Sequence, residues 1–197
     1  MDYCLSKDNI EILQAYVFTQ ELEVCGYFDV VDNILGTQEL TISHESIKEG
    51  IKYEDRQACF SLQSEYMFHT HPPSQMSHPS IEDAKLIIER NIKVSVIATR
   101  WGIYTIKKKN KDFLKNLKSS GNYKEYIRFI EDVLNNFTNY QLAFGHPKVL
   151  IGLSEPMMVD MLNRINSAEK DLQISFRKWD DLIQKEEVRK FKRKKLA

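Results

Sequence analysis

Apolar and polar residues alternate along the chain with two different periods, which indicates a mixture of helices and strands. Near the start, Ile10, Leu13 and Val17 share one helical face, and Asp8 and Glu11 have the spacing of a capping box, so a helix is expected there. Short apolar or aromatic runs between turn residues predict strands. They are expected at residues 24–31, 38–42, 65–70, 92–98 and 102–107, with a turn at residues 33–36 and a short strand at residues 59–62.

Helical spacing returns at Ser80 and dominates beyond Lys109. A helix is expected from Ser80 to about Arg90, so strands and helices follow one another as in an α/β protein. Further helices are expected at residues 113–117, at residues 123–137 and from about residue 156, with a break at residues 143–150 in which His146 is read as a loop residue. We therefore expect one domain over residues 1–109 and a helical C-terminal extension over residues 110–197.

Composition narrows the class of protein. The 197 residues are 42% hydrophobic, enough for a full core, and the 28 basic residues balance 28 acidic ones. No global field therefore draws the chain to nucleic acid or membrane. The run at residues 189–195 is strongly basic and is expected to be a solvated tail, with a nuclear address or a weak polyanion contact as the alternatives.

The cysteines and the start of the chain suggest an intracellular protein. Cys4, Cys25 and Cys59 are odd in number and lack metal-binding spacing, which argues against a disulfide framework and a zinc ribbon and fits a reducing compartment. Cys25 is interpreted as a small buried thiol rather than a nucleophile. The chain shows neither a signal peptide nor an apolar run long enough for a membrane span, so a cytoplasmic or nuclear location is expected.

Residues 68–83 carry the most specific chemistry. His69 and His71 are two residues apart on an expected strand, which places both imidazoles on one face, roughly 7 Å apart along the backbone. Asp83, in the first turn of the next helix, completes a two-histidine, one-carboxylate set that leaves a fourth zinc position for water. A simpler role for Asp83 is to favour the positive end of that helix.

A general base is available upstream. Glu23 precedes the apolar sequence Val-Cys-Gly, and a carboxylate beside an activated water can take its proton and pass it to a leaving amine. Glu21 is its nearest rival, since strand alternation places both on the same face. The choice of Glu23 rests on the three residues that follow it.

Together these segments resemble the JAMM/MPN metallopeptidases. The family pattern, a glutamate in an E-V-x-G-like strand followed by H-[S/T]-H-P and S-x-x-D, is matched by Glu23, by His69 to Pro72 and by Ser80 to Asp83. The resemblance spans about residues 8–107. It implies an MPN (cytidine-deaminase-like) fold in residues 1–109, with a mixed central sheet flanked by helices.

The same resemblance assigns roles to the matched residues. It implies one Zn²⁺ per chain held by His69, His71 and Asp83, with Glu23 as general acid and base and Ser80 as the donor that steadies the oxyanion. Ser80 would also be a good N-cap on its own account. The chain has eight residues rather than the usual seven between His71 and Ser80, so strict counting would make Glu82 the ligand; the P-S-x-x-D register favours Asp83.

The expected function is that of a zinc-dependent isopeptidase that removes ubiquitin or a ubiquitin-like modifier. One alternative keeps the chemistry but changes the substrate to another peptide or to a sulfur-carrier conjugate. The other is a non-catalytic MPN scaffold that binds a protein partner through the C-terminal helices. The complete polar set argues against the scaffold, since a scaffold does not need it.

Overall fold

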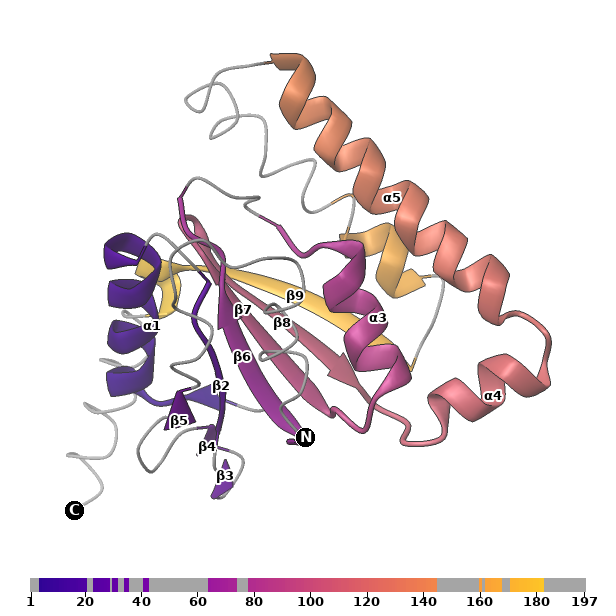
Figure 1. Ribbon diagram of the computed structural model, residues 1–197, viewed down its shortest axis with the longest axis horizontal. Coiled ribbons are helices and arrows are strands. Elements are labelled where there is room, and N and C mark those ends of the chain that lie inside the picture. Colours follow the sequence, from indigo (N-terminus) through magenta and orange to yellow (C-terminus); the bar gives the residue numbers. More distant parts are fainter. Residues whose placement is uncertain are drawn as a thin grey trace. The chain divides into compact units, whose positions relative to one another are not determined.

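The computed structural model describes residues 4–20, 23–28, 30–31, 34–35, 41–42, 64–73, 78–144, 160, 162–167 and 171–182. Its described part is an α/β fold with a mixed sheet flanked by helices, which confirms the expected class at that level (Figure 1). Several expectations, namely the strand at residues 59–62, Glu21, His146 and the basic tail, lie outside the described residues.

Two compact units make up the chain, and each combines separate stretches of sequence. The first is Met1–His78 with Ser95–Thr105 and Phe176–Ala197, and the second is Pro79–Val94 with Ile106–Ser175.

The main sheet has six strands in the order β5-β2-β6-β7-β8-β9. They are β2 (Cys25–Tyr27), β5 (Thr41–Ile42), β6 (Tyr66–Thr70), β7 (Val94–Thr99), β8 (Gly102–Lys108) and β9 (Leu172–Lys178). Every residue of β7 is buried, as suits a strand inside a sheet. A two-residue turn joins β7 to β8, so these strands form the antiparallel pair that the sequence predicts.

A second, small sheet corrects the reading of residues 24–36. The expected continuous strand is interrupted after Tyr27, and β3 (Val30–Val31) pairs instead with β4 (Ile34–Leu35). β4 lies where a turn was expected, and it also pairs in parallel with β1 (Cys4–Leu5). Strands of two residues have no measurable period, so the sequence pattern could not distinguish them from a longer strand and a turn.

Helix α1 (Lys7–Thr19) covers β6 with its apolar face. Ile10, Leu13 and Val17 are buried as expected, and the helix packs against β6. Its N-cap is Ser6, whose hydroxyl accepts a hydrogen bond from Asn9 N at 3.3 Å, so the expected capping box at Asp8 and Glu11 is wrong by two residues.

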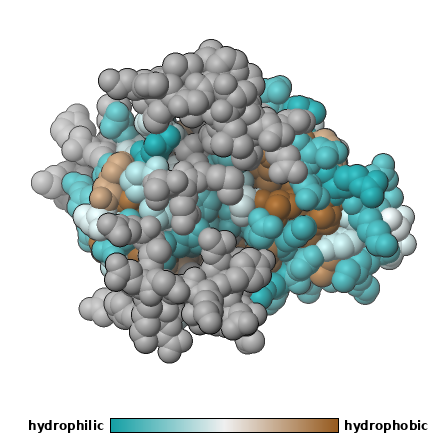
Figure 2. All heavy atoms as spheres, turned by 45° about the horizontal axis from the view of Figure 1, so that its top comes forward, coloured by the Kyte–Doolittle hydropathy of each residue, from teal (hydrophilic) through white to brown (hydrophobic). Residues whose placement is uncertain are grey.

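The outward face of α1 carries two apolar side chains. Among the described residues, the exposed large hydrophobic side chains are Ile12 and Phe18. Figure 2 shows that hydrophilic side chains cover most of the coloured surface on the face drawn. No helix in the described part of the chain is long and apolar enough to cross a membrane.

The second unit contains α3 (Ile81–Glu89), α4 (Phe113–Ser119) and α5 (Tyr123–Phe144), which contact one another pairwise. Phe113 meets Tyr126 edge to face with ring centroids 5.7 Å apart, and Ile87 and Ile130 are fully buried. The helices expected at residues 113–117 and 123–137 are therefore present, the second extended to Phe144.

The C-terminal region is not wholly helical, which corrects another expectation. Residues 162–167 are helical, but Leu172–Lys178 form β9, which is next to β8 at the end of the strand order. The side chain of Asn166 holds this strand by bonding Ile174 twice: Nδ2 donates to its carbonyl at 2.8 Å and Oδ1 accepts from its N–H at 2.7 Å.

Candidate metal centre

The two histidines occupy the end of an interior strand. On one side of β6, Cys25 pairs with His69, and on the other side the backbone N–H of His71 donates to Ala98 O at 2.8 Å. Between the histidines, Thr70 bonds Val24 twice: its N–H donates to the carbonyl and its hydroxyl accepts from the N–H, both at 2.9 Å. These bonds fix the backbone from which both imidazoles project.

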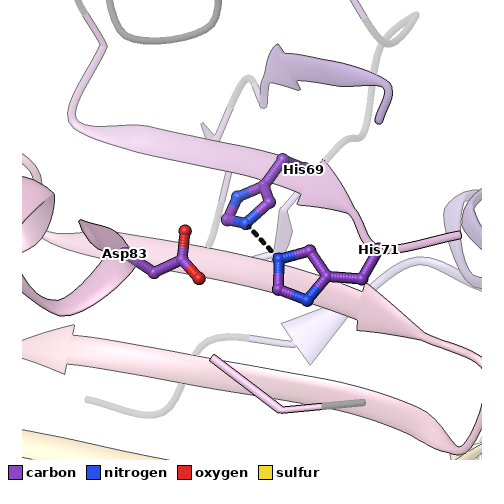
Figure 3. A group of neighbouring side chains, drawn as sticks. All are labelled: His69, His71 and Asp83. Carbon is purple, nitrogen blue, oxygen red and sulfur yellow. Dashed lines mark hydrogen bonds between the residues drawn. The ribbon is translucent and has the colours of Figure 1, made fainter. Parts of the chain in front are cut away.

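The imidazoles meet through their Nε2 atoms. Figure 3 shows both rings turned toward each other, and the Nε2 atoms of His69 and His71 are 3.2 Å apart. Two nitrogens bound tetrahedrally to one zinc ion at 2.0–2.1 Å are separated by roughly 3.3–3.4 Å. The observed separation therefore suits two nitrogens that share one ion.

Asp83 belongs to a capping box at the start of α3. Its Oδ2 accepts hydrogen bonds from Ser80 N at 2.6 Å and from Ser80 Oγ at 2.9 Å, while Asp83 N donates to Ser80 Oγ at 3.1 Å. These bonds hold the carboxylate in one orientation, and the side chain is buried. Capping, the simpler role considered for Ser80, is thus present, and its hydroxyl is the contact that positions Asp83.

The structure brings His69, His71 and Asp83 into one group. Their candidate ligand atoms all lie within 4.8 Å of one another, and in Figure 3 the carboxylate of Asp83 faces the two rings. Glu82, the rival ligand, is exposed on the same helical turn and is not part of the group. Two neutral imidazoles and a carboxylate are a donor set that zinc accepts, so the residues fit this ion.

Glu23 is placed by the register of β2 and β6. Cys25 pairs with His69 and Gly26 with Phe68, and this register, continued through the doubly bonded Val24 and Thr70, brings Glu23 opposite His71. Directly opposite residues of an antiparallel pair have their side chains on one face. If the register is continued beyond the ends of both strands, it points to Glu23 on the face of the two histidines. Glu23 is not within the metal-binding group, and its role as the base stays a prediction.

Cys25, also on this face, departs from the expectation. It is buried but disulfide-bonded, not a free thiol. A nucleophilic role is excluded for a sulfur in this state. The bond also does not fit the reducing compartment that the cysteine pattern suggested, because disulfides persist mainly under oxidising conditions.

Two features of the site were missed from the sequence. Thr70 braces the backbone between the two histidines through its two hydrogen bonds to Val24. Arg100 donates from Nη1 to Pro73 O at 3.3 Å, two residues beyond His71. Neither contact has a local sequence signature, because both join distant segments.

Comparison with protein-family models and with curated proteins found no match for this chain.

Proposed function

We propose that this chain is a zinc-dependent peptidase of the JAMM/MPN type. Its preferred target is the isopeptide bond that links ubiquitin or a ubiquitin-like modifier to a lysine. The observation that carries the proposal is the group of His69, His71 and Asp83, whose ligand atoms lie within 4.8 Å of one another.

His69, His71 and Asp83 would hold one zinc ion. When bound, zinc supplies a Lewis acid that polarises a carbonyl and lowers the pKa of water toward neutrality. The hydrogen bonds from Ser80 keep Asp83 oriented, since partners of a ligating carboxylate fix its position and its basicity.

Glu23 would carry the proton. Its carboxylate takes a proton from the attacking water as the carbon–oxygen bond forms, and it returns that proton to the lysine nitrogen as the carbon–nitrogen bond breaks. Ser80 Oγ donates its one hydrogen to Asp83 Oδ2 in the structure, and in this proposal the hydroxyl turns from Asp83 to donate to the oxygen that gains negative charge.

Cleavage assays on ubiquitin dimers and short lysine-branched peptides test the proposal. Zinc-loaded wild type should cleave at least one class, and Glu23→Gln should keep its zinc and fold while turnover falls by roughly 10²–10⁴-fold. Glu11→Gln, a change at an exposed carboxylate of α1, is the matched control and should leave turnover intact.

Each result separates the alternatives. Cleavage of peptides but not of ubiquitin dimers would move the substrate to another peptide or a sulfur-carrier conjugate. Full activity in Glu23→Gln would overturn the catalytic proposal. So would a zinc-loaded wild type that cleaves no substrate, and the scaffold reading would then remain.

A further inference from the structure

The turn between β7 and β8 lies beside the segment that follows the histidines. It consists of Arg100 and Trp101, directly after the strand whose Ala98 carbonyl accepts from His71 N. Arg100 Nη1 donates to the carbonyl of Pro73 at 3.3 Å. Two separate hydrogen bonds thus tie β7 and this turn to the two ends of the segment His71–Pro73.

Three contacts hold the turn in one conformation. Thr99 Oγ1 donates to Gly102 O at 3.0 Å and accepts from Trp101 N at 3.3 Å. The indole of Trp179 donates to Thr99 O at 3.1 Å. The backbone of the turn is therefore ordered before any ligand arrives, which lowers the entropic cost of binding there.

The turn presents two hydrogen-bond donors that the described protein does not use. The guanidinium of Arg100 stacks on the Trp101 ring, 4.6 Å from its centroid. Arg100 Nε and Trp101 Nε1 are both covered from solvent, and neither has a hydrogen-bond partner among the described residues. Buried donors without a partner are unfavourable, so a ligand that supplies an acceptor recovers free energy at this point.

The guanidinium of Arg100 is also partly buried. Burial lowers the pKa of its guanidinium, and this is the one cause that shifts it, with no contribution from an acidic partner in the described residues. A partly desolvated cation of this kind favours an anionic ligand over a neutral one.

We infer that Arg100 and Trp101 form a subsite for a carboxylate of the substrate, such as an acidic side chain close to the scissile bond. With Nη1 engaged by Pro73, the donors left for a carboxylate are Nη2 and the covered Nε, which together form a planar fork that matches two carboxylate oxygens once the cover over Nε moves aside. The indole N–H of Trp101, whose ring stacks on the guanidinium, adds a further donor. Carboxylate binding stands on these residues alone, whereas its part in substrate selection rests on the proposed peptidase function.

Binding is tested by NMR on the full ¹⁵N-labelled chain. The chain has two tryptophans, so Trp101→Phe assigns both indole N–H signals. N-acetyl-glutamate N-methylamide should shift the Trp101 indole and the Arg100 Nε–H, while the bonded Trp179 indole stays as the internal reference. The glutamine analogue is the matched neutral probe. The titration is repeated after a chelator has removed the metal, so that any shift caused by a carboxylate bound to metal disappears.

A shift with the glutamate probe alone, retained after chelation, supports the subsite. No shift at any accessible concentration, equal shifts with both probes, or a shift lost on chelation overturns it.

Kinetics distinguish this inference from the proposed function. For substrates with an acidic residue near the cleaved bond, Arg100→Gln should raise KM by roughly 10–100-fold, the value of a charged hydrogen bond, with kcat and zinc content unchanged. Arg100→Lys keeps the charge but loses the fork and should recover only part of the loss. If the enzyme is active and Arg100→Gln leaves KM unchanged, the subsite is contradicted and the peptidase function is not. If the protein binds the carboxylate probe but cleaves no substrate, the peptidase function is contradicted and the subsite is not.

Discussion

Asp83 shows how one side chain can serve the fold and the site together. Its Oδ2 accepts from the backbone and hydroxyl of Ser80, which caps α3, and its carboxylate faces the histidines. The helix start therefore positions the carboxylate without a separate support. The sequence alone did not decide whether Asp83 or Glu82 is the ligand. The structure distinguishes them, because the first turn of α3 buries Asp83 and exposes Glu82.

Zinc affinity separates the two carboxylates. Asp83→Asn keeps the shape of the side chain and can still cap the helix, but it removes the charged ligand. Loss of a residue that only hydrogen-bonds to a metal ligand lowers metal affinity by about 10–100-fold, so loss of the ligand charge itself should lower zinc affinity by more than about 100-fold. Glu82→Gln should leave affinity nearly unchanged. Competition with a chromophoric chelator measures both, and a larger loss in Glu82→Gln would transfer the ligand role to Glu82.

Glu23 illustrates what residue patterns cannot give. The alternation of strand residues left Glu21 and Glu23 on one face, and only the register of β2 with β6, continued beyond both strands, brings Glu23 opposite His71. Register depends on long-range hydrogen bonds such as those between Val24 and Thr70, 46 residues apart, and no local window contains them. The placement of His69 and His71 on one face, by contrast, followed from strand geometry alone.

Among the elements, the longer ones could be predicted and the short ones could not. α1, α5 and the β7–β8 pair have a full period of buried residues, whereas β3 and β4 have two residues each. β9 was missed for another reason: its residues do alternate, with Leu172 and Ile174 buried, but they follow a charge-rich stretch that was read as helical. The alternation that predicts a strand was present, but the helical and charged residues before it favoured a helical interpretation.

The turn from β7 into β8 requires glycine at position 102. Gly102 has φ +151°, and a Cβ there would lie 2.1 Å from the carbonyl oxygen of Arg177. Because backbone cannot give way as a side chain can, Gly102→Ala should lower the free energy of unfolding by at least roughly 1–3 kcal/mol, measured by urea denaturation.

Gly121→Ala is the matched control for this clash. Gly121 also has positive φ, +78°, but a Cβ there meets nothing within 4 Å, so only the backbone conformation is penalised, by about 1–2 kcal/mol. A Gly102→Ala variant no less stable than Gly121→Ala would contradict the close approach of β8 to Arg177.

The end of α3 and the start of α5 are joined by a hydrogen bond that depends on pH. The phenol of Tyr123 donates to the carboxylate of Glu89, and chiefly this bond raises the pKa of Tyr123 to about 12, with burial and the charge of Glu89 adding to it. A pKa raised on folding stabilises the protein below the ordinary value of about 10, and this contribution is lost as pH rises through about 12.

Glu89→Gln should therefore bring the pKa of Tyr123 down toward about 10. Phenolate absorbance follows the titration, and subtraction of the Tyr123→Phe curve isolates this residue from the other tyrosines. Identical Tyr123 curves with and without the Glu89 carboxylate would show that the bond does not form.

At the scale of the whole molecule, the α/β class followed from the order of strands and helices, and the structure has it. The expectation of a helical region beyond residue 109 failed in part, because β9 returns to the main sheet. A strand that pairs with segments far earlier in the chain leaves no local sign of its partner. The JAMM/MPN family and its isopeptidase activity stay proposals, supported by the motif and by the grouping of its residues.

The central claim is that one zinc ion binds to His69, His71 and Asp83, and elemental analysis of the purified chain tests it most directly. After dialysis against zinc-free buffer, wild type should retain about one zinc per chain, the capacity of a single three-ligand site. The His69→Ala, His71→Ala double variant, shown to be folded by circular dichroism, should retain almost none. Full zinc occupancy in the double variant, or none in wild type supplied with zinc, would contradict the account.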